Sequence, residues 1–323
     1  MTKAVRIHKT GGPEVMMWED VEVGNPGPGE IRIKQNAVGL NYIDVYFRTG
    51  LYPAELPATI GMEAAGVVEA VGDGVTEFKA GDRVAYPMVP GAYTEARCMP
   101  IQKVVKLPDG IDDQTAAAMM LKGLTAHYLL FRTYKVQPGD NILVYAAAGG
   151  VGLILCQWAK KLGATVIGCV GDEEKAALAM ANGCDHPILY RDENIPARVK
   201  ELTNGEGVAV AYDSIGKATF MDSLDSLRPF GVMATFGNAS GPVEAFNPGI
   251  LAPKGSLYVT RPTLGTHTAT RELLTEGTDR LFAAVLSGDV NISVNQTYPL
   301  SEVRQAHTDL EARKTTGSTV FTV

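Results

Sequence analysis

The stretch Val144-Tyr-Ala-Ala-Ala-Gly-Gly-Val-Gly152 decides the fold of this chain. The β-branched and aromatic residues of 141–146 are typical of a buried strand, and the apolar run over 150–162 is typical of a helix. A tight turn from a strand into a helix presents unpaired backbone N–H groups and the positive end of the helix dipole. Because both features suit a pyrophosphate, the stretch predicts a dinucleotide-binding loop.

The loop is an imperfect form of the G-x-G-x-x-G fingerprint. Ala147 stands at the first glycine position, and Gly149 and Gly152 occupy the other two. Gly149 would let the backbone approach the phosphates, and Gly152 would let the helix lie close to the strand. An isolated match of this kind is weak, so the prediction depends on the surrounding pattern.

Strands and helices continue to alternate after the loop. Six strands with helical crossovers indicate a doubly wound parallel sheet. The predicted strands lie at 141–146, 165–170, 187–190, 208–213, 232–236 and 256–260, and the predicted helices at 150–162, 173–182, 195–202 and 218–227.

The residues before the loop predict a small barrel-like β domain. Alternation over 30–35 and glycine-bounded apolar runs over 66–72 and 78–84 are typical of short, half-exposed strands. Composition then changes to helix formers, with Thr115 as the expected cap of a helix over 116–121.

The residues after Arg261 break the alternation. They predict helices at 271–286 and 302–313 and a strand at 318–323, too few elements for a separate domain. We therefore expect them to complete the first domain. The predicted division is 1–122 with 265–323 for the β-rich domain and 123–264 for the inserted nucleotide domain, with a ligand cleft at the border.

Composition narrows the function classes. Hydrophobic residues make up 46% and charged residues 20% of the 323 residues, as in ordinary globular proteins. The formal net charge of -7 argues against a nucleic-acid partner. No apolar run approaches the ~20 residues needed to cross a bilayer, and residues 1–7 read as a strand, so we expect a cytoplasmic protein without a membrane partner.

Cysteines, histidines and serines show no pattern of a metal site or a hydrolase. The four cysteines lie far apart, which predicts free thiols. The five histidines are scattered, which favours surface or helix-packing roles. Ser214 has no G-x-S-x-G setting, which argues against a hydrolase.

The end of the predicted second strand bears on the choice of coenzyme. An NAD site places an acid there for the ribose hydroxyls, but this strand ends at Val170-Gly171. Asp172 follows at once, and a one-residue shift of the strand end would restore NAD. Lys175 and Tyr190 could reach the same corner, where a lysine favours the extra phosphate of NADP(H). The residues thus favour NADP(H) and leave NAD open.

Five motifs are more specific together than the loop alone. They are Gly39-Leu-Asn-Tyr-Ile-Asp44, Gly61-Met-Glu-Ala-Ala-Gly66, Lys122-Gly-Leu-Thr125, Ala146-Ala-Ala-Gly-Gly-Val-Gly152 and Val259-Thr-Arg-Pro262. In this order, over nearly the whole chain, the set resembles the zinc-free, zeta-crystallin-like NADPH:quinone oxidoreductases of the medium-chain dehydrogenase/reductase superfamily. The resemblance implies α/β architecture, with a GroES-like catalytic domain, an inserted Rossmann domain and usually a homodimer.

The resemblance also implies site residues. Asn41 would orient the substrate by hydrogen bonding, and Tyr46 and Tyr52 would form pocket walls in a loop region facing the nicotinamide. Asp172 departs from the uncharged residues expected beside the coenzyme. The residues implied to hold NADPH are Asn41, Thr125, Gly149, Gly150, Val151, Gly171, Lys175, Tyr190, Ser214, Phe236, Gly237, Asn238, Ser240, Thr260, Arg261, Pro262 and Arg313.

The zinc-dependent relatives provide a contrast. They place a cysteine where this chain has Asn41 and a histidine where it has Met62, and neither substitute is a good zinc ligand. The closely spaced cysteines of their structural zinc site are missing too. We therefore expect no metal and a quinone substrate, which is electron-poor enough to accept hydride, or two single electrons, without a Lewis acid.

Two other functions stay open at this point. One is NADPH-dependent reduction of activated alkenes such as α,β-unsaturated ketones on the same fold. The other is an NADPH-binding sensor or an RNA-binding protein of the kind known in this family, although the acidic charge argues against RNA. Strand 256–260, at the expected edge of the sheet, could pair with its copy in a homodimer.

Overall fold

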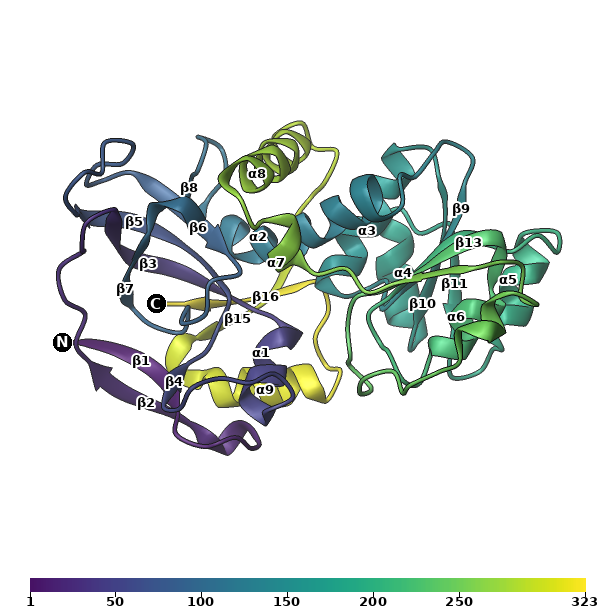
Figure 1. Ribbon diagram of the computed structural model, residues 1–323, viewed down its shortest axis with the longest axis horizontal. Helices are drawn as coiled ribbons and strands as arrows, with labels where there is room; N and C mark the ends of the chain where they lie inside the picture. The colour runs from purple at the N-terminus through teal and green to yellow at the C-terminus, as the bar shows by residue number, and fades with distance from the viewer. The chain divides into compact units, whose positions relative to one another are not determined.

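A computed structural model describes all residues of the chain, 1–323, as two compact units (Figure 1). Unit 1 consists of Met1–Leu124, Thr268–Leu286 and Ile292–Val323, and unit 2 of Thr125–His267 and Ser287–Asn291. Unit 2 is thus inserted into the chain of unit 1. Residues 287–291, which the sequence assigned to the first domain, group with unit 2.

Unit 1 is built on two β-sheets. β3 is the centre of the larger sheet, and its buried Ile31 and Ile33 alternate with the outward-facing Arg32 and Lys34. The smaller sheet has the order β2-β1-β4, and the larger has the order β15-β16-β3-β5-β6-β8 with β7 also paired to β3. The strands are β1 (Thr2–Ile7), β2 (Met16–Val21), β3 (Glu30–Leu40), β4 (Ala58–Thr59), β5 (Glu63–Val71), β6 (Arg83–Pro87), β7 (Ala96–Pro100), β8 (Val105–Lys106), β15 (Val294–Pro299) and β16 (Ser318–Thr322).

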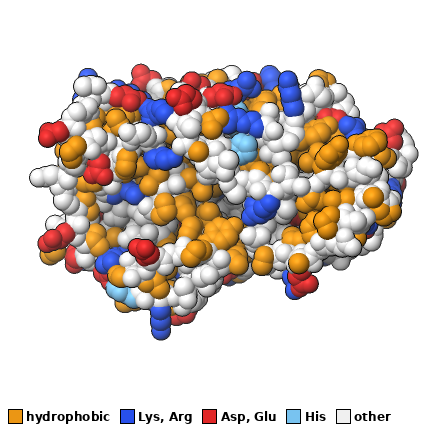
Figure 2. Space-filling view, in the orientation of Figure 1, with side chains coloured by type: hydrophobic (Ala, Val, Ile, Leu, Met, Phe, Trp, Pro, Cys, Tyr) orange, Lys and Arg blue, Asp and Glu red, His pale blue; other side chains and the backbone are white.

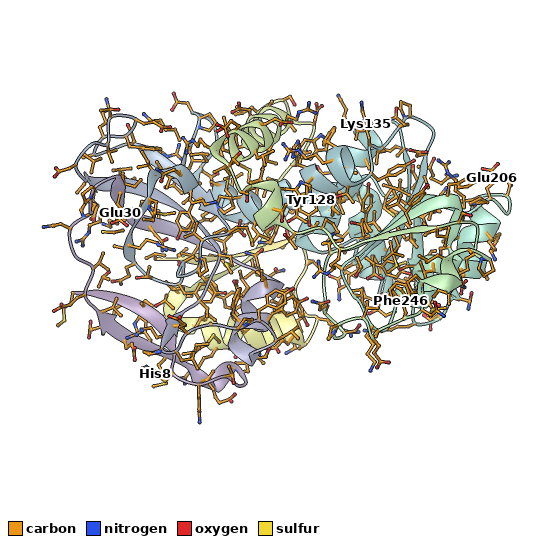
Figure 3. All side chains as sticks on the ribbon, viewed as in Figure 1. His8, Glu30, Tyr128, Lys135, Glu206 and Phe246 are labelled. Atoms are coloured by element: carbon orange, nitrogen blue, oxygen red, sulfur yellow. The ribbon has the colours of Figure 1, made fainter.

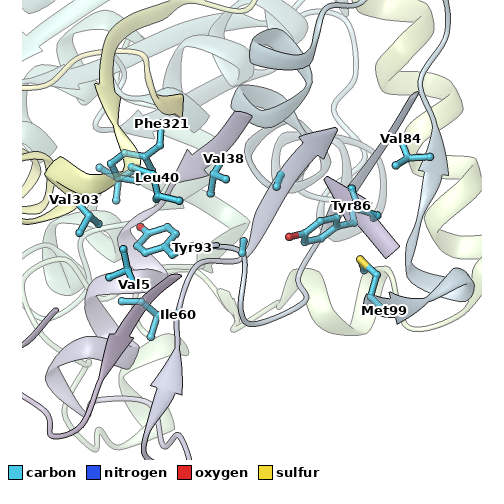
Figure 4. Packing of buried hydrophobic residues seen from close by; sticks show 14 of the residues in the cluster. Val5, Val38, Leu40, Ile60, Val84, Tyr86, Tyr93, Met99, Val303 and Phe321 are labelled. Carbon is cyan, nitrogen blue, oxygen red and sulfur yellow. The ribbon is translucent and has the colours of Figure 1, made fainter. Parts of the chain in front are cut away.

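Apolar side chains from both ends of the chain form the core of unit 1. Figure 4 shows Tyr93 among Val5, Leu40, Val303 and Phe321, so the C-terminal segments pack on the N-terminal strands. Of the residues after Arg261, Thr268–Leu286 and Ile292–Val323 group with the first domain, whereas residues 262–267 and 287–291 group with unit 2. The helices of unit 1 are α1 (Tyr42–Thr49), α8 (Arg271–Leu286) and α9 (Val303–Glu311), together with most of α2 (Asp113–Tyr128).

Unit 2 is the predicted doubly wound sheet. Its six strands are all parallel in the order β11-β10-β9-β12-β13-β14, which is the 3-2-1-4-5-6 order of the Rossmann fold. The strands are β9 (Asn141–Tyr145), β10 (Thr165–Val170), β11 (His186–Leu189), β12 (Val208–Asp213), β13 (Leu227–Thr235) and β14 (Tyr258–Thr260). Helices α3 (Gly150–Lys161), α4 (Glu173–Ala181), α5 (Ile195–Leu202) and α6 (Phe220–Asp225) lie beside it in Figure 1, and α7 (Leu264–His267) follows β14.

Several local predictions were wrong. α2 begins at Asp113 and is capped by Asp112 rather than Thr115, because the Asp112 carboxylate accepts the Thr115 N–H at 2.7 Å. The predicted helix over 218–227 is only Phe220–Asp225, since β13 already begins at Leu227. Strand 78–84 is shifted to Arg83–Pro87.

The surface carries both charge signs. In Figure 2 basic and acidic side chains are interspersed over the face shown, among apolar ones. Among the helices, none combines the length and the apolar character that a membrane span requires.

Candidate active site

The glycine turn of unit 2 leads directly from β9 into α3. Gly149 is the N-cap of α3 and provides no side-chain hydrogen bond to the first turn, so the backbone N–H groups there keep their donor capacity for a ligand. A Cβ on Gly152 would lie 2.2 Å from the Ala146 carbonyl oxygen. Only glycine therefore lets α3 start this close to the strand.

The alanine in the fingerprint is accommodated by a neighbouring glycine. Ala147 is fully buried, and a Cβ built on Gly168 of β10 would lie 2.8 Å from the Ala147 Cβ. Gly168 on the neighbouring strand thus leaves the space that the Ala147 methyl group occupies. The turn keeps its compact form with Ala147 in place.

The corner at the end of β10 brings Asp172, Lys175 and Tyr190 together. The Asp172 carboxylate caps α4 by accepting the Lys175 N–H at 2.9 Å, and that bond lowers the Asp172 pKa. The Lys175 Nζ lies 3.5 Å from the same carboxylate. A Cβ on Gly171 would lie 3.1 Å from the Tyr190 hydroxyl. The acid therefore serves the helix and the lysine rather than standing as a free ribose ligand.

The loops after β12 and β13 are tied to each other. A Cβ on Gly237 would lie 2.3 Å from the Ser214 carbonyl oxygen. The Ser240 hydroxyl donates to the Ile215 carbonyl at 2.9 Å. Phe236 and Asn238 flank Gly237 on the same loop. Because all strands of the sheet are parallel, these loops and the glycine turn all lie at the carboxyl ends of the strands.

A third cluster of predicted site residues in unit 2 lies around the ring of Tyr128, which is labelled in Figure 3. Its ring stacks on His267, with centroids 4.5 Å apart and planes inclined by 4°. Burial raises the Tyr128 pKa, while Arg261 and a hydrogen bond with Thr125 lower it. The structure thus brings Thr125 and Arg261 to one ring, and Thr260 and Pro262 flank Arg261. Thr125 lies near the end of α2.

In unit 1, Asn41 belongs to a buried polar network. Its Nδ2 donates to Glu63 Oε1 at 2.7 Å, and the Lys122 Nζ lies 3.0 Å from the same oxygen. The Leu121 N–H donates to the other Glu63 oxygen at 2.6 Å. Glu63 is fully buried, so these donors compensate its desolvation. Three of the five sequence motifs each contribute a residue to this network.

Tyr46 and Tyr52 lie beside each other, with ring centroids 5.2 Å apart. Tyr46 is a buried residue of α1, so the prediction of a loop there was wrong. The cause is the N-cap at Asn41, whose N–H donates to Asp44 Oδ2 at 2.8 Å and starts a helix. Arg313 is an exposed residue of unit 1, at a positive φ of 60° just after α9.

Comparison with known proteins identifies the family. A quinone oxidoreductase of Pseudomonas aeruginosa is 53% identical over 323 residues, which cover 99% of each chain. The chain belongs to the quinone oxidoreductase family. A 2-haloacrylate reductase of Burkholderia is 47% identical, again over 99% of both chains.

Solved structures and family profiles agree with this quinone oxidoreductase assignment. The Escherichia coli quinone oxidoreductase complexed with NADPH has a TM-score of 0.97 at 47% identity, covering 99% of this chain and 100% of that one. Residues 27–138 match the alcohol dehydrogenase GroES-like domain, and residues 150–278 match the zinc-binding dehydrogenases. This confirms the predicted GroES-like and Rossmann architecture of the medium-chain dehydrogenase/reductase superfamily.

The zinc named by the second family profile does not fit the donors of this quinone oxidoreductase. Asn41 and Met62 are poor zinc ligands, and Glu63 is already held by Asn41 and Lys122. No group of three or more His, Cys, Asp or Glu side chains is arranged to hold a metal ion.

Sequence reasoning missed part of the network. Asp44, Glu63 and Lys122 stood inside quoted motifs without an assigned role, and they could have been recognised as charged residues within otherwise apolar segments. His307 is fully buried, and Arg48 is 1% exposed. Nothing in the local sequence pairs these two side chains, because they are 259 residues apart.

Proposed function

We propose that this protein reduces quinones with NADPH and without a metal ion. The observation that carries the proposal is the buried network of Asn41, Glu63 and Lys122, in which Asn41 stands where the zinc-dependent relatives have a cysteine. A hydride donor bound at the glycine turn of unit 2 needs no electrophile when the acceptor is a quinone. The NADPH complex of the Escherichia coli relative supports this choice of coenzyme.

The coenzyme side of the proposal rests on unit 2. The N-terminus of α3, capped only by Gly149, suits the pyrophosphate, and Lys175 with Tyr190 suits the phosphate of the adenosine ribose. Asn41 and Arg313 belong to unit 1. The other proposed contacts are Thr125, Gly150, Val151, Gly171, Ser214, Phe236, Gly237, Asn238, Ser240, Thr260, Arg261 and Pro262.

The substrate side rests on unit 1. Asn41 gives one Nδ2 proton to Glu63, which fixes the amide and leaves the second Nδ2 proton as the donor that a quinone carbonyl requires. Tyr46 and Tyr52 offer aromatic walls. Bound NADPH supplies a hydride, and the hydroquinone takes its proton from water. The residues therefore contribute orientation rather than acid catalysis.

Substitution of Asn41 tests this function. For N41A we expect the kcat/KM for a benzoquinone to fall by about tenfold or more, and the Kd for NADPH to rise by a smaller factor because Asn41 is also a proposed coenzyme contact. The control is N36A, which removes an exposed asparagine whose Nδ2 donates a hydrogen bond to Asp113 Oδ2 at 2.7 Å. Full quinone turnover in N41A, or none in the wild type, would contradict the proposal.

Reduction of activated alkenes is a second candidate. The 47% identity to a 2-haloacrylate reductase favours it. Product analysis separates the two reactions, because an unsaturated ketone gives a saturated ketone and a quinone gives a hydroquinone. The alkene becomes the preferred substrate class if its kcat/KM exceeds that of every quinone tested.

We also propose a homodimer through the edge of the Rossmann sheet. β14 is an edge strand, and its Tyr258 is 59% exposed. Phe230, on the adjacent strand β13, is 69% exposed. Pairing of two β14 strands would cover both the edge and these rings. Sedimentation of the wild type should give a dimer, and Y258D should dissociate it. The control is M221D, at the exposed Met221, which should leave the dimer intact. A monomeric wild type would reject the proposed homodimer.

The cysteines support a cytoplasmic location. All four are free, and Cys156, Cys169 and Cys184 are buried. Free thiols are typical of proteins in a reducing compartment.

A further inference from the structure

We propose that a buried hydrogen-bond relay from Arg48 through His307 and Tyr93 to Asp44 holds Asn41 in position for the acceptor. His307 and Tyr93 are then positioning residues that act through Asp44. This inference rests on the proposed role of Asn41 in quinone reduction.

The relay has one direction, which donor and acceptor chemistry fixes. Arg48 Nη1 lies 3.0 Å from His307 Nδ1, and a guanidinium can only donate, so Nδ1 is the acceptor. The neutral ring then carries its proton on Nε2, which lies 3.0 Å from the Tyr93 hydroxyl and donates to it. Tyr93 therefore directs its own proton to Asp44 Oδ2 at 2.8 Å.

The relay ends on the residue that orients Asn41. Asp44 Oδ2 accepts both the Tyr93 hydroxyl and the Asn41 backbone N–H, the latter at 2.8 Å. Asp44 Oδ1 is buried without a hydrogen-bond partner, so the rotation of the carboxylate depends on these two donors. A change at Tyr93 would consequently reach the Asn41 backbone through one shared oxygen.

A helix cap alone does not require this arrangement. Arg48 is 1% exposed and is held by Glu311 Oε1 at 2.8 Å and the Gly11 carbonyl at 3.1 Å in addition to His307. Buried charges are costly, and well-packed apolar residues often give equal stability. The polar relay instead fixes α1, which carries Tyr46, against α9, which carries His307.

Two matched tyrosines make the inference testable. Tyr93 and Tyr86 are both fully buried in the core of unit 1 (Figure 4), and the Tyr86 hydroxyl donates to Gln35 Oε1 rather than to Asp44. Y93F and Y86F each remove one buried hydroxyl, so both should lower Tm. Only Y93F should lower kcat/KM for the quinone, by about tenfold. Equal kinetic effects of the two variants would overturn the proposal.

Nuclear magnetic resonance of the wild type and these variants tests the relay without turnover. The ¹⁵N spectrum should show His307 with its proton on Nε2, and the opposite tautomer would overturn the relay. The amide signal of Asn41 should shift in Y93F and not in Y86F. If the wild type reduces no quinone, the proposed function fails, whereas these signals still decide whether Asn41 is positioned by the relay.

Discussion

The Lys122 Nζ lies 3.0 Å from Glu63 Oε1, and both side chains are buried. Their attraction must offset the desolvation of two charges, which succeeds only with further hydrogen bonds. Asn41 and the Leu121 N–H supply them to Glu63. The ion pair and the proposed substrate residue thus depend on one carboxylate.

Breaking this ion pair should destabilise unit 1. E63Q leaves the Lys122 charge buried without its partner, so we expect the free energy of unfolding to fall by about 3–5 kcal/mol. The double variant E63Q/K122M should recover part of the lost free energy of unfolding. Urea titration measures both, with D289N as a control because the Lys161 and Asp289 side chains are 60% and 33% exposed. Equal losses in E63Q and D289N would contradict the prediction.

Asp172 should weaken the preference for NADPH over NADH. Its carboxylate lies 3.5 Å from Lys175 Nζ and adds negative charge where the phosphate would bind. D172N keeps a side-chain cap for α4 and removes the charge. We expect the ratio of kcat/KM for NADPH to that for NADH to rise about five- to tenfold, consistent with about 1 kcal/mol.

The control for D172N is E174Q, an exposed acid on the same helix. K175A should lower the same ratio. An unchanged ratio in D172N, or a rise of the same size in E174Q, would show that Asp172 does not face the coenzyme phosphate.

Gly168 should be required by the alanine in the fingerprint. In G168A the new Cβ would lie 2.8 Å from the Ala147 Cβ and 2.7 Å from the Cys184 Sγ, so we expect a loss of about 1–3 kcal/mol. A147G in the same chain should return part of the stability, since it restores the usual glycine. G24A is the control, because a Cβ there meets nothing within 4 Å. No rescue by A147G would disprove the compensation.

The relay should leave a signature in the pH dependence of stability. Burial, then Arg48, lowers the His307 pKa from 6.5 to about 3, so its contribution is present above pH 6.5 and lost as pH falls toward 3. Burial raises the Asp44 pKa from 3.8 to about 7, so its contribution is present below pH 3.8 and lost as pH rises through 7. The two slopes oppose each other between pH 3.8 and 6.5.

Removing the histidine should expose the Asp44 slope. In H307Q, the free energy of unfolding should fall with rising pH from 3.8 to about 7, by as much as about 1.4 kcal/mol per pH unit. H186Q, at a half-buried histidine of β11, should keep the wild-type profile. Identical pH profiles in the two variants would contradict the assignment.

The sequence could predict the helices and strands better than the side-chain contacts between them. The parallel sheet, the glycine turn and α8 at Arg271–Leu286 followed from hydrophobic periodicity and turn residues. β15 was missed because its half-exposed, polar Val294–Pro299 lacks an apolar pattern. The contact of His307 with Tyr93 joins residues 214 apart, which no local pattern encodes.

The most direct test of the central claim is anaerobic NADPH oxidation by the purified protein with 1,4-benzoquinone, with and without a metal chelator, and with hydroquinone measured as product. A metal-free reductase gives one hydroquinone per NADPH at a rate that the chelator does not change. No hydroquinone, or turnover abolished by the chelator, would contradict the account.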